Sequence, residues 1–190
     1  MIAACLVAIT ATSLGQVPTV GFDSTVTGMT FPGRVAAAGS VVYVTDQGGR
    51  AVLEVSGGVV ANTYPIAEGP VGIAVHPTNG KIYVSRMDGQ VGIYDAACAL
   101  QGTLDPAPMT MITPNDIAVH PTTGEVYVVD SGEHQVLVFS GFADTLVRAF
   151  GSEGSGLGEF RSPQAIAIDP VLNQIIVADT DNFRVQVFDP

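Results

Sequence analysis

The sequence is poor in several features that define common protein classes. It contains no tryptophan, two cysteines, and seven lysine and arginine residues against 18 acidic residues among 190. Nucleic-acid surfaces need clustered basic side chains, so a net charge of -11 argues against a nucleic-acid partner. Cys5 and Cys98 are too few for a disulfide framework. Beyond the N-terminus no apolar run reaches the ~18 residues that a membrane span needs, so no membrane-spanning segment is expected.

The N-terminal residues 1–16 resemble the end of a secretory signal, with an apolar stretch followed by small residues. We therefore expect residues 1–16 to be a signal-peptide-like or disordered segment, and the protein to be secreted, periplasmic or extracellular. The sequence Ile2-Ala3-Ala4-Cys5 also resembles a lipoprotein box. Position five is too early for a complete signal of that kind, so a lipid anchor at Cys5 is not expected.

The chain is rich in repetition: one pattern recurs at residues 31–55, 69–95, 113–140 and 162–189. The second and third copies read P-V-G-I-A-V-H-P-T-N-G-K-I-Y-V and P-N-D-I-A-V-H-P-T-T-G-E-V-Y-V. The first prolines of the copies, 38, 44 and 49 residues apart, are Pro32, Pro70, Pro114 and Pro163. Short strands repeated at this period are typical of β-propeller blades. The pattern predicts an all-β propeller domain over residues 17–190, with four blades of four antiparallel strands.

The two ends of the repeat array leave two interpretations open. The fourth copy ends at Pro190 after its third strand, while residues 24–31 form a strand-like segment ahead of the first copy. That N-terminal strand could complete the last blade and hide both edges. Alternatively, the chain is a fragment of a larger propeller. The fragment interpretation is favoured because the sequence ends directly after a strand.

The fourth unit carries a resemblance to a known family. It reads F-G-S-E-G-S-G-L-G-E-F from Phe150, then P-Q-A-I-A-I-D, then V-A-D-T-D-N-F-R-V-Q-V-F. This resembles the NHL repeat, and the resemblance covers about residues 31–190. It is weaker in the first unit, where Val35-Ala36-Ala37-Ala38 replaces the usual inner strand. NHL propellers usually have six blades, so the resemblance supports the fragment interpretation.

The resemblance implies binding more than catalysis. Members of the family include RNA-binding domains, extracytoplasmic sensor domains of bacterial kinases and a metal-dependent amidating lyase. The charge of -11 conflicts with RNA binding. The lyase has zinc-ligating histidines after the first proline of its blades, where this chain has Gly33, Val71, Asn115 and Gln164. His134 falls where another of its histidines would lie, but the ordinary NHL pattern also has histidine there.

Repeated polar residues are expected to be structural. His76 and His120 occupy one position in successive units, and Asp169 replaces them in the fourth, which favours hydrogen bonding to the adjacent turn. Three second strands end in a carboxylate that would accept loop N–H groups, at Asp46, Asp130 and Asp179. A ring of Ca²⁺ ligands is the alternative, which Arg86 would interrupt in the remaining unit. We therefore predict no metal site and no cofactor, with Ca²⁺ as the alternative.

Residues that deviate from the repeat are better candidates for ligand contact. Two positions after the first proline, the units carry Arg34, Gly72, Asp116 and Ala165. A charged side chain there must point into a wet channel, because an unpaired buried charge is costly. We predict a ligand-binding set on one loop face, made of Arg34, Arg86, Asn115, Asp116 and Gln164. Alternatively, Arg34 and Asp116 only pair with each other or with water.

These observations favour a binding module over an enzyme. The sequence has no recognisable Ser-His-Asp pattern, and no catalytic residue is predicted. We expect an extracytoplasmic propeller that binds a protein, peptide or carbohydrate through the loop face around its channel. The alternative is a metal-dependent propeller enzyme of the lactonase, hydrolase or lyase type, using acidic channel residues.

Overall fold

The computed structural model describes residues 25–190, which form four antiparallel sheets. Blade 1 contains β1 (Pro32–Ala38), β2 (Val41–Asp46), β3 (Ala51–Ser56) and β4 (Val59–Pro65). Blade 2 contains β5 (Pro70–Val75), β6 (Ile82–Arg86), β7 (Val91–Tyr94) and β8 (Leu100–Thr103). Blade 3 contains β9 (Pro114–Val119), β10 (Val126–Asp130), β11 (Gln135–Phe139) and β12 (Leu146–Phe150). Blade 4 contains β13 (Pro163–Asp169), β14 (Gln174–Asp179), the short 3₁₀ helix η1 (Thr180–Asn182) and β15 (Arg184–Phe188).

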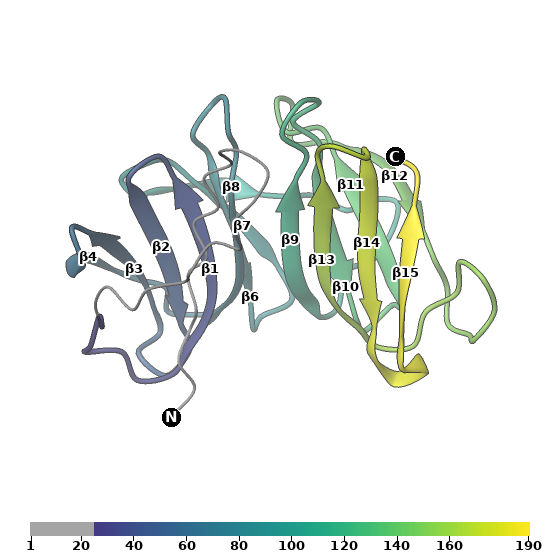
Figure 1. The fold of residues 1–190 in the computed structure, drawn as a ribbon, viewed down its shortest axis with the longest axis horizontal. Helices are drawn as coiled ribbons and strands as arrows, with labels where there is room; N and C mark the ends of the chain where they lie inside the picture. Colours follow the sequence, from purple (N-terminus) through teal and green to yellow (C-terminus); the bar gives the residue numbers. More distant parts are fainter. Residues whose placement is uncertain (1–24) are drawn as a thin grey trace, which may run out of the picture.

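The four blades follow one another around a common axis, which runs roughly vertically in Figure 1. The inner strands β1, β5, β9 and β13 pack on each other in that order, and the second strands of blades 1, 2 and 3 each touch the next inner strand. The predicted propeller, with blades that begin at four repeated prolines, is confirmed. Figure 1 also shows β1 and β13 apart on the near side, with β9 visible between them.

The hairpins between first and second strands form as the repeat predicts. Nδ1 of His76 accepts the N–H groups of Thr78 and Asn79, and Nδ1 of His120 does the same for its own turn. Each turn closes with a residue at positive φ, as in Gly80 and Gly124. The structural role of the two histidines is confirmed.

The core lies between the faces of successive blades. Strand β11 alternates sides: Val136 and Val138 face blade 4, while Leu137 and Phe139 face blade 2. All four are fully buried because blade 3 is covered on both faces. Burial on both faces explains why the strand segments of the sequence are almost continuously apolar.

The carboxylates that end the second strands hold the segment leading into their own blade. Asp46 accepts the N–H groups of Thr30, Phe31 and Gly49. Asp130 binds Ile112 and Thr113 in the same way, and Asp179 binds the N–H of Arg161. Burial would raise the pKa of Asp46, but these donors outweigh it and lower the pKa. The predicted hydrogen bonding to loop N–H groups is confirmed.

One part of the sequence prediction is wrong. Residues 25–31 form no strand, and their end is bound to Asp46 in blade 1 rather than to the last blade. Blade 4 therefore has three strands within the described residues. The signal-like residues 1–16, with Cys5, and residues 17–24 of the predicted domain lie outside the described residues. No helix in residues 25–190 is long and apolar enough to cross a bilayer.

Candidate ligand-binding site at the channel mouth

Two sets of loops share one side of the molecule. The turns between second and third strands and the connections between blades lie where the inner strands begin. We call this side the mouth face; it is the lower side of Figure 1, where η1 also lies. The opposite side carries the repeated histidine turns. Arg34, Asn115, Asp116 and Gln164 all lie near the start of an inner strand, and hence at the mouth face.

Arg34 and Asp116 meet across the channel mouth. Nε of Arg34, on β1, lies 3.3 Å from Oδ1 of Asp116, on β9. Nη2 of Arg34 also donates to the backbone carbonyl of Gln164, on β13, over 3.2 Å. Oδ2 of Asp116 accepts the N–H of Ile166 at 3.0 Å. Burial raises the pKa of the Asp116 carboxyl, and the N–H of Ile166 and the charge of Arg34 offset this only in part.

Two amide side chains extend this group. Nδ2 of Asn115 donates to Oε1 of Gln164 and to Oγ of Ser131, each over 2.8 Å. Blades 1, 3 and 4 are thereby linked by side chains at one point. Four of the five predicted site residues lie together, and their contact with a ligand stays a prediction.

Small residues let the inner strands approach closely enough to build this site. A Cβ on Gly72 would lie 2.8 Å from the carbonyl oxygen of Asn115 and 3.1 Å from Cα of Asp116. The register of β5 shifts beside it, and the Gly72 N–H there bonds to Oγ of Ser85 over 2.7 Å. Blade 1 repeats the arrangement, with Oγ1 of Thr45 accepting the N–H of Arg34. The hydroxyl side chains satisfy backbone groups that the irregular pairing leaves free.

A depression of about 290 Å³ opens at this point, lined by Phe31, Gly33, Arg34, Gln47, Val71, Asn115 and Gln164. The side chain of Arg34 is 44% exposed, so it is accessible to a ligand. Arginine and the primary amides supply N–H donors, and the amides also supply carbonyl acceptors. The arrangement can bind and orient a polar group.

The fifth predicted residue, Arg86, does not join this group. It is buried at the end of β6, where its guanidinium donates to Asp88 and to Oε1 of Gln90. Arg86 thus takes the place of the repeated aspartates but binds its own turn. Its role as a ligand contact is not supported by its position.

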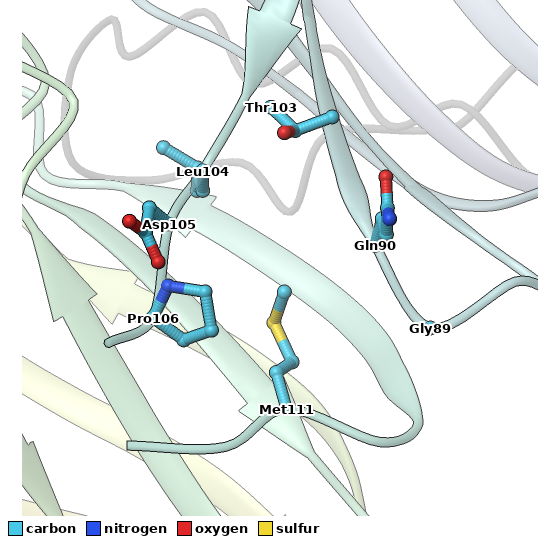
Figure 2. A pocket seen from close by; sticks show the side chains of 7 residues that line it. All are labelled: Gly89, Gln90, Thr103, Leu104, Asp105, Pro106 and Met111. Carbon is cyan, nitrogen blue, oxygen red and sulfur yellow. The ribbon is translucent and has the colours of Figure 1, made fainter. Parts of the chain in front are cut away.

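Sequence reasoning did not find a second depression, of about 430 Å³, beside the connection from blade 2 to blade 3. Figure 2 shows Met111 on one side of it, with Gln90, Thr103 and Asp105 around it. The signal that could have found it is the long connection 104–113, which carries two prolines and two methionines between blades. Over residues 25–190, no three His, Cys, Asp or Glu side chains gather as a metal-binding group would.

Two segments match the NHL repeat, residues 112–139 and 160–188. These are the third blade and the fourth, each beginning in the segment that Asp130 or Asp179 holds. The matches cover the first three strands of blade 3 and the three strands of blade 4. No curated protein matches the sequence.

Solved structures share the propeller fold. Hydrazine synthase from Kuenenia stuttgartiensis matches with a TM-score of 0.69 and 18% identity, over 92% of this chain and 49% of that one. A chain of a mitotic checkpoint complex matches with a TM-score of 0.65 and 12% identity, over 84% and 49%. Virginiamycin B lyase from Staphylococcus aureus matches with a TM-score of 0.64 and 12% identity, over 81% and 50%. The chain described here spans about half the length of each of these three chains. At such low sequence identities the likeness shows a shared fold and nothing more.

Proposed function

We propose that this chain is an extracytoplasmic NHL-repeat module that binds a protein, peptide or carbohydrate ligand at its mouth face. The observation that carries the proposal is the linked group of Arg34, Asp116, Asn115 and Gln164, which comes from three blades and borders a depression. Function often resides in loops and strand ends that a rigid scaffold positions. The extracytoplasmic location rests on the signal-like residues 1–16.

The chemistry of the site narrows the ligand. Arg34 is paired with Asp116, so the site is polar without a strong charge of either sign. Phe31 exposes an aromatic ring at the rim of the same depression. Hydrogen-bonding groups beside an exposed ring suit a ligand with both amide or hydroxyl groups and an apolar face. Peptides and saccharides meet this description.

A metal-dependent propeller enzyme remains the alternative prediction from the sequence. Virginiamycin B lyase shares the propeller fold with this chain, but at 12% identity the likeness extends no further. No contact among the described residues favours the enzyme over the binding module.

The proposal is tested by a thermal-shift screen of the protein against defined soluble oligosaccharides and short peptides. A compound that raises the melting temperature is then titrated by calorimetry against Arg34→Ala and Gln164→Ala. We expect each substitution to weaken binding by about tenfold or more, the effect of losing a hydrogen bond to a charged or desolvated group.

Arg50→Ala is the matched control, because Arg50 is an exposed arginine on the same face whose Nη1 bonds to the carbonyl of Ala67, away from the depression. Its affinity should equal that of the wild type. If Arg34→Ala binds normally while substitution of Lys81, beside the repeated turn, abolishes binding, the ligand uses the opposite face and the proposal is wrong.

A further inference from the structure

The second depression, of about 430 Å³, lies between blades 2 and 3, and each of these two blades has a neighbouring blade on both sides. Its volume falls in the range of roughly 300–1,000 Å³ that is usual for pockets that bind small groups. It shares no lining residue with the depression beside Arg34. It is therefore a separate candidate site, and the proposed function does not depend on it.

The floor of this depression is part of the core between the two blades. Leu104 is buried in that core, and the half-buried Met111 packs against the same cluster. Figure 2 shows the side chain of Met111 extending toward Thr103, with Asp105 and Pro106 to its left. The depression thus combines an apolar floor with polar side chains around it.

Hydrogen bonds hold the connection 104–113 in place at both of its ends. The N–H of Leu104 bonds to the carbonyl of Val91 over 3.0 Å, which fixes the start of the connection to blade 2. Near the other end, Nε2 of Gln135 on blade 3 donates to the carbonyl of Thr110 over 2.7 Å. The depression is therefore formed before a ligand arrives, so binding costs little ordering of the chain.

Asp105 is the acidic residue of the lining. Its Oδ1 accepts the N–H of Ala107 over 3.0 Å, which orients the carboxylate on its own loop. Among residues 25–190, Asp105 takes part in no ion pair, and its Oδ2 has no hydrogen-bond partner. An oriented carboxylate oxygen of this kind can accept a hydrogen bond from a cationic donor.

The positive charge nearest in the chain, on Arg86, is already balanced. Its guanidinium donates to both carboxylate oxygens of Asp88, over 3.2 and 2.9 Å. Its Nη2 also donates to Oε1 of Gln90 over 2.7 Å, which leaves the amide nitrogen of Gln90 available to a ligand. Because Arg86 and Asp88 cancel, Asp105 sets the sign of the charge at the depression, and the net charge of -11 acts in the same direction.

We propose that this depression binds the side chain of a lysine presented by a basic peptide. The ammonium group bonds to Oδ2 of Asp105, with the exposed hydroxyl of Thr103 as a second acceptor. The aliphatic stem of the lysine lies along Met111 and Pro106, and the amide nitrogen of Gln90 donates to the peptide backbone. Arginine fits less well, because its flat guanidinium prefers two carboxylate oxygens and the N–H of Ala107 already occupies one.

NMR of isotope-labelled methionine methyl groups on the full chain tests the site. N-acetyl-lysine methylamide is titrated into the protein, and the Met111→Leu variant assigns the Met111 resonance. We expect this resonance to shift and to saturate with a Kd on the order of 1 mM, because one exposed ion pair and a short apolar stem supply little free energy. The resonance of Met29, which packs in blade 1, should not move.

The charge and the stem are tested separately. The corresponding norleucine derivative keeps the stem and lacks the ammonium group, so it should bind about three- to fivefold more weakly than the lysine derivative. Added salt should weaken binding of the lysine derivative and leave that of the norleucine derivative unchanged. Equal affinity of the two derivatives would contradict the proposal, as would tighter binding of the arginine derivative.

Asp105→Asn removes the charge but keeps an oxygen for the N–H of Ala107, so the loop should hold its conformation. We expect it to weaken lysine binding by about three- to fivefold. Asp95→Asn is the matched control, because Oδ1 of Asp95 accepts the N–H of Ala97 in the same way, over 2.9 Å, outside the depression. It should bind the lysine derivative as the wild type does.

Three results would overturn the proposal: a Met111 resonance that lysine does not move, an Asp105→Asn variant that binds normally, or an equal loss in Asp95→Asn. The Arg34→Ala variant, which should impair binding at the mouth face, should bind the lysine derivative normally. Failure of this inference is therefore distinguishable from failure of the proposed function.

Discussion

The guanidinium of Arg34 in blade 1 and the carboxylate of Asp116 in blade 3 form an ion pair across the channel mouth, with 3.3 Å between Nε and Oδ1. Arg34 is partly exposed, while Asp116 lies mostly buried beside Ile166. The pair is therefore asymmetric: the arginine can turn to a ligand, whereas the aspartate is fixed by the backbone.

The first prediction concerns the pH dependence of stability at this pair. Burial raises the pKa of Asp116 above its ordinary value of 3.8, so the protonated form contributes stability that is full below 3.8 and is lost as pH rises through the folded-state pKa. Asp116→Asn cannot titrate and should remove this loss. Urea unfolding across pH 3 to 7 measures the free energy of unfolding of both proteins. As pH rises, the variant should become more stable relative to the wild type. A pH-independent difference would contradict it.

The second prediction concerns Asp46, whose pKa is shifted in the opposite direction to that of Asp116. The N–H groups of Thr30, Phe31 and Gly49 lower its pKa against the effect of burial, so its ionised form contributes stability that is present above 3.8 and lost as pH falls through the folded-state pKa. Asp46→Ala leaves those donors without their acceptor and should cost about 2–3 kcal/mol at neutral pH. Asp181→Ala, which removes an exposed carboxylate, should change the unfolding free energy by less than about 0.5 kcal/mol.

The third prediction concerns the space between β5 and β9. Gly72→Ala would place a Cβ 2.8 Å from the carbonyl oxygen of Asn115 and 2.8 Å from Oγ of Ser85. The strand that carries Asp116 must then shift, which should cost about 1–3 kcal/mol in chemical denaturation. Gly102→Ala on β8 is the control, because nothing lies within 4 Å of its added Cβ. Equal stability of the two variants would show that the inner strands are not closely packed.

The fourth prediction concerns His76. Burial lowers the pKa of its imidazole from 6.5, so the neutral form contributes stability that is lost as pH falls from 6.5 through the folded-state pKa. His76→Gln should abolish this loss below pH 6.5, although it lowers the unfolding free energy by about 1 kcal/mol at pH 7 through the weaker turn. A wild-type chain whose stability is flat over that range would contradict the prediction.

The residues that sequence reasoning placed correctly are those with local or repeated roles. The prolines that begin the inner strands, the turn histidines and the aspartates at strand ends each act on backbone a few residues away or on the segment leading into their own blade. These roles could be recognised from the sequence because the same residue type recurs at the same position in several blades, which indicates a shared structural role. The segment before β1 was misread as a strand, although its end follows the repeat: the N–H groups of Thr30 and Phe31 bond to Asp46 as those of Ile112 and Thr113 bond to Asp130.

The candidate site shows the limit of the same reasoning. The sequence marked Arg34 and Asp116 as charges at a position where small residues are usual, but it could not decide whether they meet, since they belong to different blades. Arg86 was grouped with them because its loop shares their face, yet its guanidinium binds Asp88 and Gln90. Contacts between blades depend on how far each sheet rotates about the axis, which no spacing in the sequence records.

By itself, the sequence determined the number of blades, the residue at which each inner strand begins and the chemistry of each turn, because alternation and turn residues act over a few positions. The tertiary structure alone decided which equivalent residues differ in environment. Nε2 of His120 meets Oδ1 of Asn173 over 2.8 Å, while Nε2 of His76 is buried beside Gly124 and has no hydrogen-bond partner among residues 25–190. Val136 and Val185 likewise share a place in the repeat but not their burial, because burial depends on the neighbouring blade and not on the residue's own strand.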